Sequence, residues 1–153
     1  MSKVTFHTEA WPDCVGEISQ HWVAHWNEVA LHKDAIPLDP DFTEYQRLHN
    51  AGQLHCTVAR SRGLCVGYAV VILRRHLHYR TSLSGLFDLY YLHPNFRRGW
   101  TGVSLFRHVE KAMRQRGVER LFTGTKLSLD ASKIFQRLGW QETERLHTKL
   151  LKE

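Results

Sequence analysis

Cysteine and proline are scarce in this sequence, and their scarcity excludes several protein classes. Only three of the 153 residues are cysteine and only four are proline. Cys14, Cys56 and Cys65 are an odd number without a paired spacing, so they indicate neither a disulfide framework nor a cysteine zinc site. We expect all three to be reduced and structural. No linker divides the chain, so we expect a single domain over residues 1–153.

Long hydrophobic runs are missing as well. The longest apolar run, residues 64–73, is too short and too strand-like to cross a bilayer, and the N-terminal residues lack the apolar region of a signal peptide. These absences predict a cytoplasmic protein that does not enter a membrane. With 42% apolar residues, the chain is nevertheless long enough for one domain with a real hydrophobic core.

Acidic residues are outnumbered by basic ones, and the two kinds are unevenly spread. Residues 1–52 hold eight acidic against three basic residues, a net charge of −5, whereas residues 53–153 hold seven acidic against 18 basic residues, a net charge of +11. The basic part suits a polyphosphate ligand and equally a nucleic acid. The acidic part suits a cationic ligand. Both parts are also compatible with plain solvated surface.

A strand, a loop and a helix follow one another in the second half of the chain. Aromatic and branched side chains fill residues 86–92, and Pro94 ends this strand because proline has no N–H for the ladder. Apolar residues then recur at helical spacing up to Gly117, which stands where a C-cap glycine belongs. This pattern predicts a helix over residues 101–116.

The loop between this strand and this helix carries two arginines and two glycines, Arg97, Arg98, Gly99 and Gly102. A loop that opens a helix presents unpaired backbone N–H groups and the positive end of the helix dipole at one point. Such a point binds phosphate, and the arginines add charge-assisted donors. The alternative is an ordinary strand-to-helix turn with solvated arginines.

Hydrophobic periodicity and turn residues predict the remaining elements. In chain order these are a strand at 5–10, a helix at 12–32 with an apolar stripe of Ile18, Trp22, Trp26 and Val29, a short helix from Asp39 or Asp41 to 51, strands at 53–61 and 64–73, a polar connection at 74–84, a strand at 119–126, a helix from Ser128 or Asp130 to 138, and a strand at 141–150.

Two histidines of the first predicted helix, His21 and His25, lie four residues apart, as in a metal-binding pair. No third ligand is marked in the sequence, and chance pairs are expected among 11 histidines. We therefore predict that the protein holds no metal.

The segment from Arg97 to Gly102 resembles motif A of the GNAT superfamily of N-acetyltransferases, whose signature is Arg/Gln-x-x-Gly-x-Gly/Ala. Arg97 takes the first position and Gly102 the last. Trp100 replaces the middle glycine, and Gly99 stands one residue early. The overall look of the chain, including His78-Tyr79 and the short tail, also resembles phage- and prophage-encoded members.

A second block supports the same family. Residues 128–140 are similar to the family pattern Asn-x-x-Ala-x-x-x-Tyr-x-x-x-Gly-Phe, with Ser128 first, Phe135 at the tyrosine position and Gly139-Trp140 at the end. The two blocks and the strand between them cover roughly half of the chain.

The resemblance implies an α/β fold with a mixed sheet, helices on both faces and the element order βααβββαβαβ. The strands at 86–92 and 119–126 splay apart in that fold, and acetyl-CoA, the co-substrate, lies between them. Implied cofactor contacts are Leu92, Arg97, Arg98, Gly99, Trp100, Gly102, Val103, Ser128 and Phe135. The family often ends with two strands where this chain has room for one. The other is either absent or supplied by a partner subunit of a homodimer.

The implied reaction moves the acetyl group to a primary amine. A protonated amine has a pKa of about 10.4, so a base must take its proton before it attacks. Asp88 is the first choice, because alternation places it with Tyr90 and Leu92 on one strand face and some family members carry a carboxylate on this strand in that role. His78, in the polar connection, is a second candidate for the proton acceptor.

The leaving thiolate also needs a proton. Many family members supply it from a tyrosine at the position of Phe135, which has no proton to give. Tyr79 or Tyr90 would then have to substitute.

The helices near the N-terminus border the acceptor pocket in the resembled family. This makes Glu28 and Tyr45 candidates for recognising the amine of a small molecule or a protein. Two other functions stay open. One is a catalytically idle fold that binds acyl-CoA or a partner, because of Trp100 and Phe135. The other is a basic protein that binds or modifies nucleic acid, which is not favoured because no recognised nucleic-acid motif is present.

Overall fold

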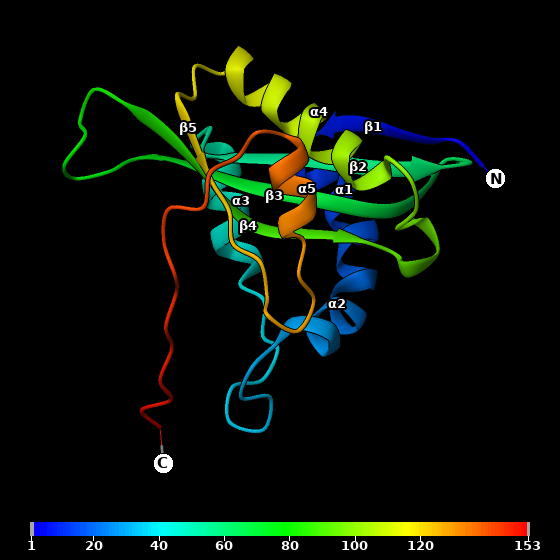
Figure 1. Cartoon of the computed structure of the whole chain (residues 1–153), viewed down its shortest axis with the longest axis horizontal. Helices are drawn as coiled ribbons and strands as arrows, with labels where there is room; N and C mark the ends of the chain where they lie inside the picture. Colours follow the sequence, from blue (N-terminus) through cyan, green and yellow to red (C-terminus); the bar gives the residue numbers. More distant parts are fainter. Residues whose placement is uncertain (1, 153) are drawn as a thin grey trace.

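The computed structural model describes residues 2–152, which form one five-stranded sheet flanked by helices (Figure 1). The strand order is β1-β2-β3-β4-β5; neighbours from β1 to β4 are antiparallel, and β5 is parallel to β4. The elements are β1 (Val4–Glu9), α1 (Trp11–Ile18), η1 (Ser19–His21), α2 (Trp22–Val29), α3 (Phe42–Asn50), β2 (Leu54–Ser61), β3 (Leu64–Arg75), β4 (Leu83–Leu92), η2 (Pro94–Phe96), α4 (Thr101–Gln115), β5 (Arg120–Phe122) and α5 (Ser132–Arg137). Within residues 2–152, no helix has the length and apolar character needed to span a bilayer.

Each face of the sheet has its own hydrophobic core. On one face, α4 contributes Leu105, Phe106 and Val109 to a cluster that includes Phe87 of β4, and α5 packs against it. On the other face, α1, α2 and α3 cover a second cluster around Tyr68 of β3. Burying each large apolar side chain contributes roughly 1.5–3 kcal/mol. The predicted mixed sheet with helices on both faces is confirmed.

The first predicted helix is interrupted. Three residues, Ser19–His21, form a 3₁₀ turn between α1 and α2, and α2 ends at Val29 rather than at residue 32. The buried side chains are Trp11, Cys14, Ile18, Trp22 and His25. The predicted stripe is therefore correct for Ile18 and Trp22 but wrong beyond them, because the 3₁₀ turn winds more tightly and rotates α2 toward His25.

Strands β4 and β5 separate soon after they meet. Residues Ser84–Leu86 pair with Arg120–Phe122, and β4 then continues alone on this side to Leu92. The predicted splay is thus present, whereas the predicted strand at 119–126 is too long. Beyond Phe122 the chain leaves the sheet. The Gly124 carbonyl accepts a hydrogen bond of 2.6 Å from the side-chain hydroxyl of Tyr90, and not from a backbone N–H of β4.

A β-bulge in β4 changes which face each side chain occupies. Leu89 pairs with Val70 and Phe87 pairs with Val71, so Asp88 is an extra residue without a partner on β3. Tyr90 packs against the α4 core, while the Asp88 side chain reaches α3 on the opposite face. The expectation that Asp88, Tyr90 and Leu92 share one face is therefore wrong, because the bulge interrupts the alternation.

The C-terminal segment contains no strand. Residues 141–152 have neither helical nor ladder hydrogen bonds, and the predicted strand at 141–150 does not form. The chain is fixed at Trp140, whose Nε1 donates to Glu110 of α4 at 2.6 Å, and then extends away from the sheet (Figure 1). A strand needs a ladder partner, and this segment forms no ladder with any strand among residues 2–152; its Lys152 Nζ instead donates to the Ala35 carbonyl at 3.1 Å.

Candidate active site

The opening of α4 has the geometry of an anion site. Gly99 adopts a left-handed conformation with φ of 58°, which glycine reaches without a Cβ penalty and which turns the chain into the helix. The backbone N–H groups of Gly102 and Val103 have no acceptor among residues 2–152. These free donors point out of the first turn, where the helix dipole is positive.

Gly102 also has a packing role. A Cβ at this position would lie 2.8 Å from Cδ1 of Ile134 in α5, so glycine allows α5 to approach the first turn of α4. Trp100 is 63% exposed beside this contact, and the guanidinium of Arg137 lies 5.6 Å from its ring centroid. The residues of the two sequence blocks therefore meet at the same place.

Arg97 is engaged by the protein itself. Its Nε donates to the Leu92 carbonyl at 2.7 Å, and its Nη2 contacts both carboxylate oxygens of Glu28 at 2.9 and 2.7 Å. The structure brings these three predicted residues together, although a separate role was expected for each. No local signal could reveal the pairing, because Glu28 lies 69 positions away from Arg97.

The open edge of β4 offers further backbone groups. The His93 N–H donates to the Val66 carbonyl at 2.8 Å, and the Tyr91 carbonyl faces Gly67, where a Cβ would lie 2.5 Å away. Because backbone groups alternate along an antiparallel strand, Leu92 directs its N–H to the other side, which β5 leaves unpaired. An extended ligand could pair there.

Tyr90 and Phe135 are in aromatic contact on the α4 side of this opening. Their ring centroids are 6.1 Å apart in an edge-on arrangement, and both rings pack on Phe106. Burial raises the pKa of Tyr90, so its hydroxyl remains protonated at neutral pH. A phenol therefore lies next to the position where the family often has its tyrosine.

Asp88 and Tyr45 form a pair on the opposite face of the sheet. The Tyr45 hydroxyl donates a short hydrogen bond to Oδ2 of Asp88, and the Tyr45 ring stacks on Trp11 at 4.5 Å. Burial and the neighbouring carboxylate raise the pKa of Tyr45, which keeps it a hydrogen-bond donor. Asp88 is exposed, so its second oxygen is accessible to a proton donor.

His78 and Tyr79 lie elsewhere. They belong to the loop between β3 and β4, at the end of β4 opposite to the loop that opens α4 (Figure 1). The ten residues of β4 separate those ends by roughly 30 Å, at about 3.3 Å per residue. The structure does not bring these two residues to the α4 opening.

Ser128 is exposed in a turn closed by a bridge between Lys126 and Leu129. It does not begin α5, contrary to one predicted alternative. Helix α5 begins at Ser132, whose N–H donates to the Asp130 carboxylate at 2.9 Å. Phe135 lies three residues further along this helix.

The two histidines of the metal hypothesis are bound to protein groups. His21 Nε2 lies 3.0 Å from the Cys65 carbonyl, and His25 Nδ1 lies 2.9 Å from the Tyr68 hydroxyl. Within the part of the chain that the structure describes, no three His, Cys, Asp or Glu side chains are grouped to hold a metal ion.

The comparisons with known proteins agree with this geometry. The model of the acetyltransferase (GNAT) family matches residues 6–140. A search of curated proteins finds no match. The likeness to phage-encoded members stays a prediction.

Several solved structures share the fold. An aminoglycoside acetyltransferase from an uncultured soil metagenomic sample, in complex with sisomicin, has 16% identity over 97% of both chains and a TM-score of 0.73. A Brucella melitensis ribosomal-protein-alanine N-acetyltransferase has 14% identity over 99% of both chains and a TM-score of 0.75. An acetyltransferase from Clostridium acetobutylicum, in a structure with acetyl-CoA, has 11% identity over 97% of both chains and a TM-score of 0.71. Because the family model covers most of the chain, the protein belongs to the GNAT family of acetyltransferases, and it is an N-acetyltransferase that uses acetyl-CoA as co-substrate.

Proposed function

We propose that the protein transfers the acetyl group of acetyl-CoA to a primary amine of a small, polycationic acceptor, with Asp88 as the general base. The observation that carries this proposal is the pair of Asp88 and Tyr45, which fixes an accessible carboxylate beside the opening between β4 and β5. The acetyl group and the amine would meet in that opening.

The α4 opening would hold the pyrophosphate of acetyl-CoA. The N–H groups of Gly102 and Val103 have no other acceptor, and the helix dipole favours a negative charge there. The pantetheine arm would follow the unpaired edge of β4 as far as Leu92. Arg97 supports this arrangement indirectly, because it holds the loop rather than reaching for the phosphate.

Asp88 would remove a proton from the ammonium group of the acceptor, directly or through one water. The freed amine nitrogen then attacks the thioester carbonyl, and the carbon–sulfur bond breaks as the nitrogen loses its second proton to water and the amide forms. The hydrogen bond from Tyr45 keeps the carboxylate of Asp88 in one orientation during this step. A backbone N–H near Leu92 would stabilise the oxyanion.

Tyr90 would return a proton to the departing thiolate. Phe135 cannot do so, and the Tyr90 ring lies against it with a protonated hydroxyl. The hydroxyl donates its proton to the Gly124 carbonyl at 2.6 Å, so it would rotate away from that carbonyl to reach the thiolate. In this chain the general acid would thus be a residue of β4, Tyr90, and not the residue of α5 at position 135.

The acidic N-terminal part supports a cationic acceptor. The helices α1–α3 cover the face of the sheet on which the Asp88 side chain lies. Ion pairs to arginine occupy Glu9, Glu17, Glu28 and Glu44. Asp34, Asp39 and Asp41 are exposed and make no ion pair within residues 2–152. Such a surface suits an amine-rich molecule of the kind that sisomicin represents in the soil-sample enzyme.

An acetyl-CoA-dependent thiol-release assay tests the proposal. Sisomicin, spermidine and a peptide with an N-terminal alanine serve as acceptors, each with the wild type, Asp88→Asn and Tyr45→Phe. We expect a polycationic amine to be the best acceptor, and Asp88→Asn to lower turnover roughly 10²-fold without changing acetyl-CoA affinity. Tyr45→Phe should have a smaller effect, because it removes only the orienting bond.

A fully active, folded Asp88→Asn variant would exclude Asp88 as the base. If the alanine peptide is the best acceptor, the proposal of a small polycationic acceptor is wrong and a protein N-terminus takes its place. If the wild type binds acetyl-CoA but acetylates no amine, the idle-fold alternative gains support.

A further inference from the structure

The β3–β4 hairpin is strongly basic. Its outer part, residues 74–84, carries Arg74, Arg75 and Arg80 within seven residues, together with His76 and His78, and no acidic residue. All three arginines are exposed. In Figure 1 this hairpin projects beyond the rest of the sheet, at the end opposite to the α4 opening.

The charge of this region is not neutralised by ion pairs. The ion pairs among residues 2–152 use Arg47, Arg60, Arg97, Arg114 and Arg145, and none uses an arginine of the hairpin. Arg116 and Arg120 add two more unpaired guanidinium groups beside the hairpin. One carboxylate lies near, that of Glu119, which accepts a hydrogen bond from Ser82 at 3.2 Å.

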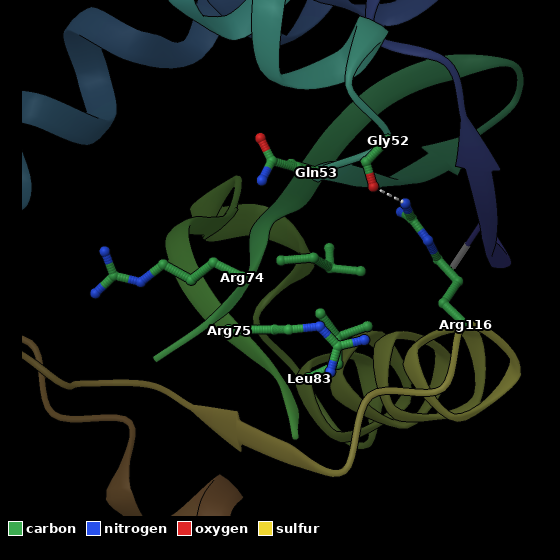
Figure 2. A pocket seen from close by; sticks show the side chains of 7 residues that line it. Gly52, Gln53, Arg74, Arg75, Leu83 and Arg116 are labelled. Atoms are coloured by element: carbon green, nitrogen blue, oxygen red, sulfur yellow. Dashed lines mark hydrogen bonds between the residues drawn. The ribbon is translucent and has the colours of Figure 1, made fainter. Parts of the chain in front are cut away.

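A hollow of about 380 Å³ lies at the base of the hairpin, next to the end of α4 (Figure 2). Arg116, at the end of α4, reaches into it and donates to the Gly52 carbonyl at 2.5 Å and to the Leu54 carbonyl at 3.0 Å. These two hydrogen bonds hold the guanidinium in place, and its positive charge is not neutralised because both acceptors are uncharged. Arg75 extends into it beside Leu83, and Arg74 points away toward solvent (Figure 2). One fixed guanidinium group and a second arginine at the same hollow are suited to phosphate oxygens.

Aromatic and apolar side chains are interleaved with these charges. Tyr79 is 52% exposed, and the guanidinium of Arg120 lies 4.9 Å from its ring centroid. Leu77, at the hairpin tip, is 99% exposed. An exposed aromatic ring backed by arginine is a platform on which an unpaired base can stack.

Acetyl-CoA does not account for this surface, because the length of β4 puts roughly 30 Å between the hairpin and the α4 opening. From the unpaired arginines, the hollow and the stacked tyrosine together, we propose that the β3–β4 hairpin is a docking surface for single-stranded nucleic acid. Phosphates bind at Arg74, Arg75, Arg80 and the Arg116 hollow, and bases stack on Tyr79.

Fluorescence anisotropy with a labelled mixed-sequence 12-nucleotide RNA, and with DNA of the same sequence, tests the proposal across a sodium chloride series. For four phosphate contacts, the logarithm of the association constant should fall with the logarithm of salt with a slope of roughly −3. The variant Arg74→Gln/Arg75→Gln/Arg80→Gln should bind at least about tenfold more weakly and show a shallower slope. Tyr79→Ala should weaken binding roughly fivefold with an unchanged slope, because it removes stacking and no charge.

The matched control is Lys3→Gln/Arg62→Gln/Arg107→Gln, which removes three exposed positive charges elsewhere and should bind like the wild type. Retained acetyl-CoA binding and near-ultraviolet circular dichroism verify that each variant is folded. Equal weakening in the control and the hairpin variant would overturn the proposal, since binding would then follow net charge alone. Tighter binding of a poly-glutamate of equal length would also overturn it and indicate an acidic protein partner. The ratio between RNA and DNA affinities identifies which nucleic acid the surface prefers.

Discussion

Arg97 and Glu28 connect two segments that lie 69 positions apart in the sequence. Through Nη2, Arg97 contacts both carboxylate oxygens of Glu28, at 2.9 and 2.7 Å, so that helix α2 is joined to the loop that opens α4. The Arg97 guanidinium also lies 5.4 Å from the Tyr91 ring centroid. The proposed acceptor side and the proposed cofactor side are therefore linked by one side chain.

We expect this link to stabilise the fold measurably. The side chains of Arg97 and Glu28 are 31% and 27% exposed, so water screens their attraction only in part. A double-mutant cycle with Glu28→Gln and Arg97→Gln should give a coupling energy of about 1 kcal/mol in urea unfolding. The control is a cycle on the more exposed pair of Glu44 and Arg47, which should couple more weakly. Equal coupling in the two cycles would contradict the expectation.

Gly102 should be sensitive to charge more than to size. Gly102→Ala places a Cβ near the flexible end of Ile134, which can shift, whereas Gly102→Glu adds a negative charge where the pyrophosphate is proposed to bind. Titration calorimetry should show an acetyl-CoA dissociation constant at least about tenfold higher for the glutamate variant and little changed for the alanine variant. Equal weakening would assign the effect to packing, and unchanged affinity in the glutamate variant would exclude the site.

A tyrosine at either position 90 or position 135 should be able to protonate the leaving thiolate. Tyr90→Phe removes the proposed proton donor, and turnover should fall roughly tenfold, a moderate loss because water can also protonate a thiolate whose thiol has a pKa of about 8.5. Phe135→Tyr alone should leave turnover unchanged or raise it. In the Tyr90→Phe background it should restore activity, which a purely structural role of the bond to Gly124 would not permit. A fully active Tyr90→Phe enzyme would exclude the assignment.

The protein should lose stability in mild acid because of two buried histidines. Burial lowers the pKa of His25 and of His55 from 6.5 to about 4. The unfolded chain therefore binds more protons than the folded one between these values, so stability is complete above pH 6.5 and declines as the pH falls toward 4. Each histidine should cost about 2 kcal/mol by pH 5, measured as the difference in urea unfolding between pH 7 and pH 5.

His55→Gln tests this assignment, since glutamine can keep a hydrogen bond to Thr57 but does not titrate. The pH-dependent loss should shrink by about half in this variant. Substitution of the exposed His78 by glutamine is the control and should change nothing. An identical pH dependence in all three proteins would show that other groups cause the acid sensitivity.

The elements with local signals were predictable. The predicted helix at 101–116 is observed at 101–115, because its apolar period is clear and Gly117 has the positive φ of 78° that a helix end uses. The strands at 119–126 and 141–150 were overestimated. Their composition favours extended backbone, but a strand exists only where a partner supplies hydrogen bonds, and that partner is not encoded locally.

The candidate site was likewise predictable only where its residues lie close together in the sequence. Arginines and glycines at the head of a helix indicated the anion site from sequence alone. The contact of Asp88 with Tyr45 joins residues 43 positions apart, and the β3–β4 hairpin carries His78 away from them because β3 runs on to Arg75. Such relations depend on strand register and strand length, which composition does not determine.

The bulge at Asp88 has a consequence for how the proposed base of this protein can be gained or lost. On either side of the extra residue, Phe87 and Tyr90 already pack against the α4 core, and Leu89 already packs on the opposite face. Deleting the single codon for Asp88 would leave a regular strand in which every other side chain keeps its face. The proposed catalytic carboxylate is thus an insertion on an intact scaffold, and gain or loss of the base is one genetic step that need not disturb the core.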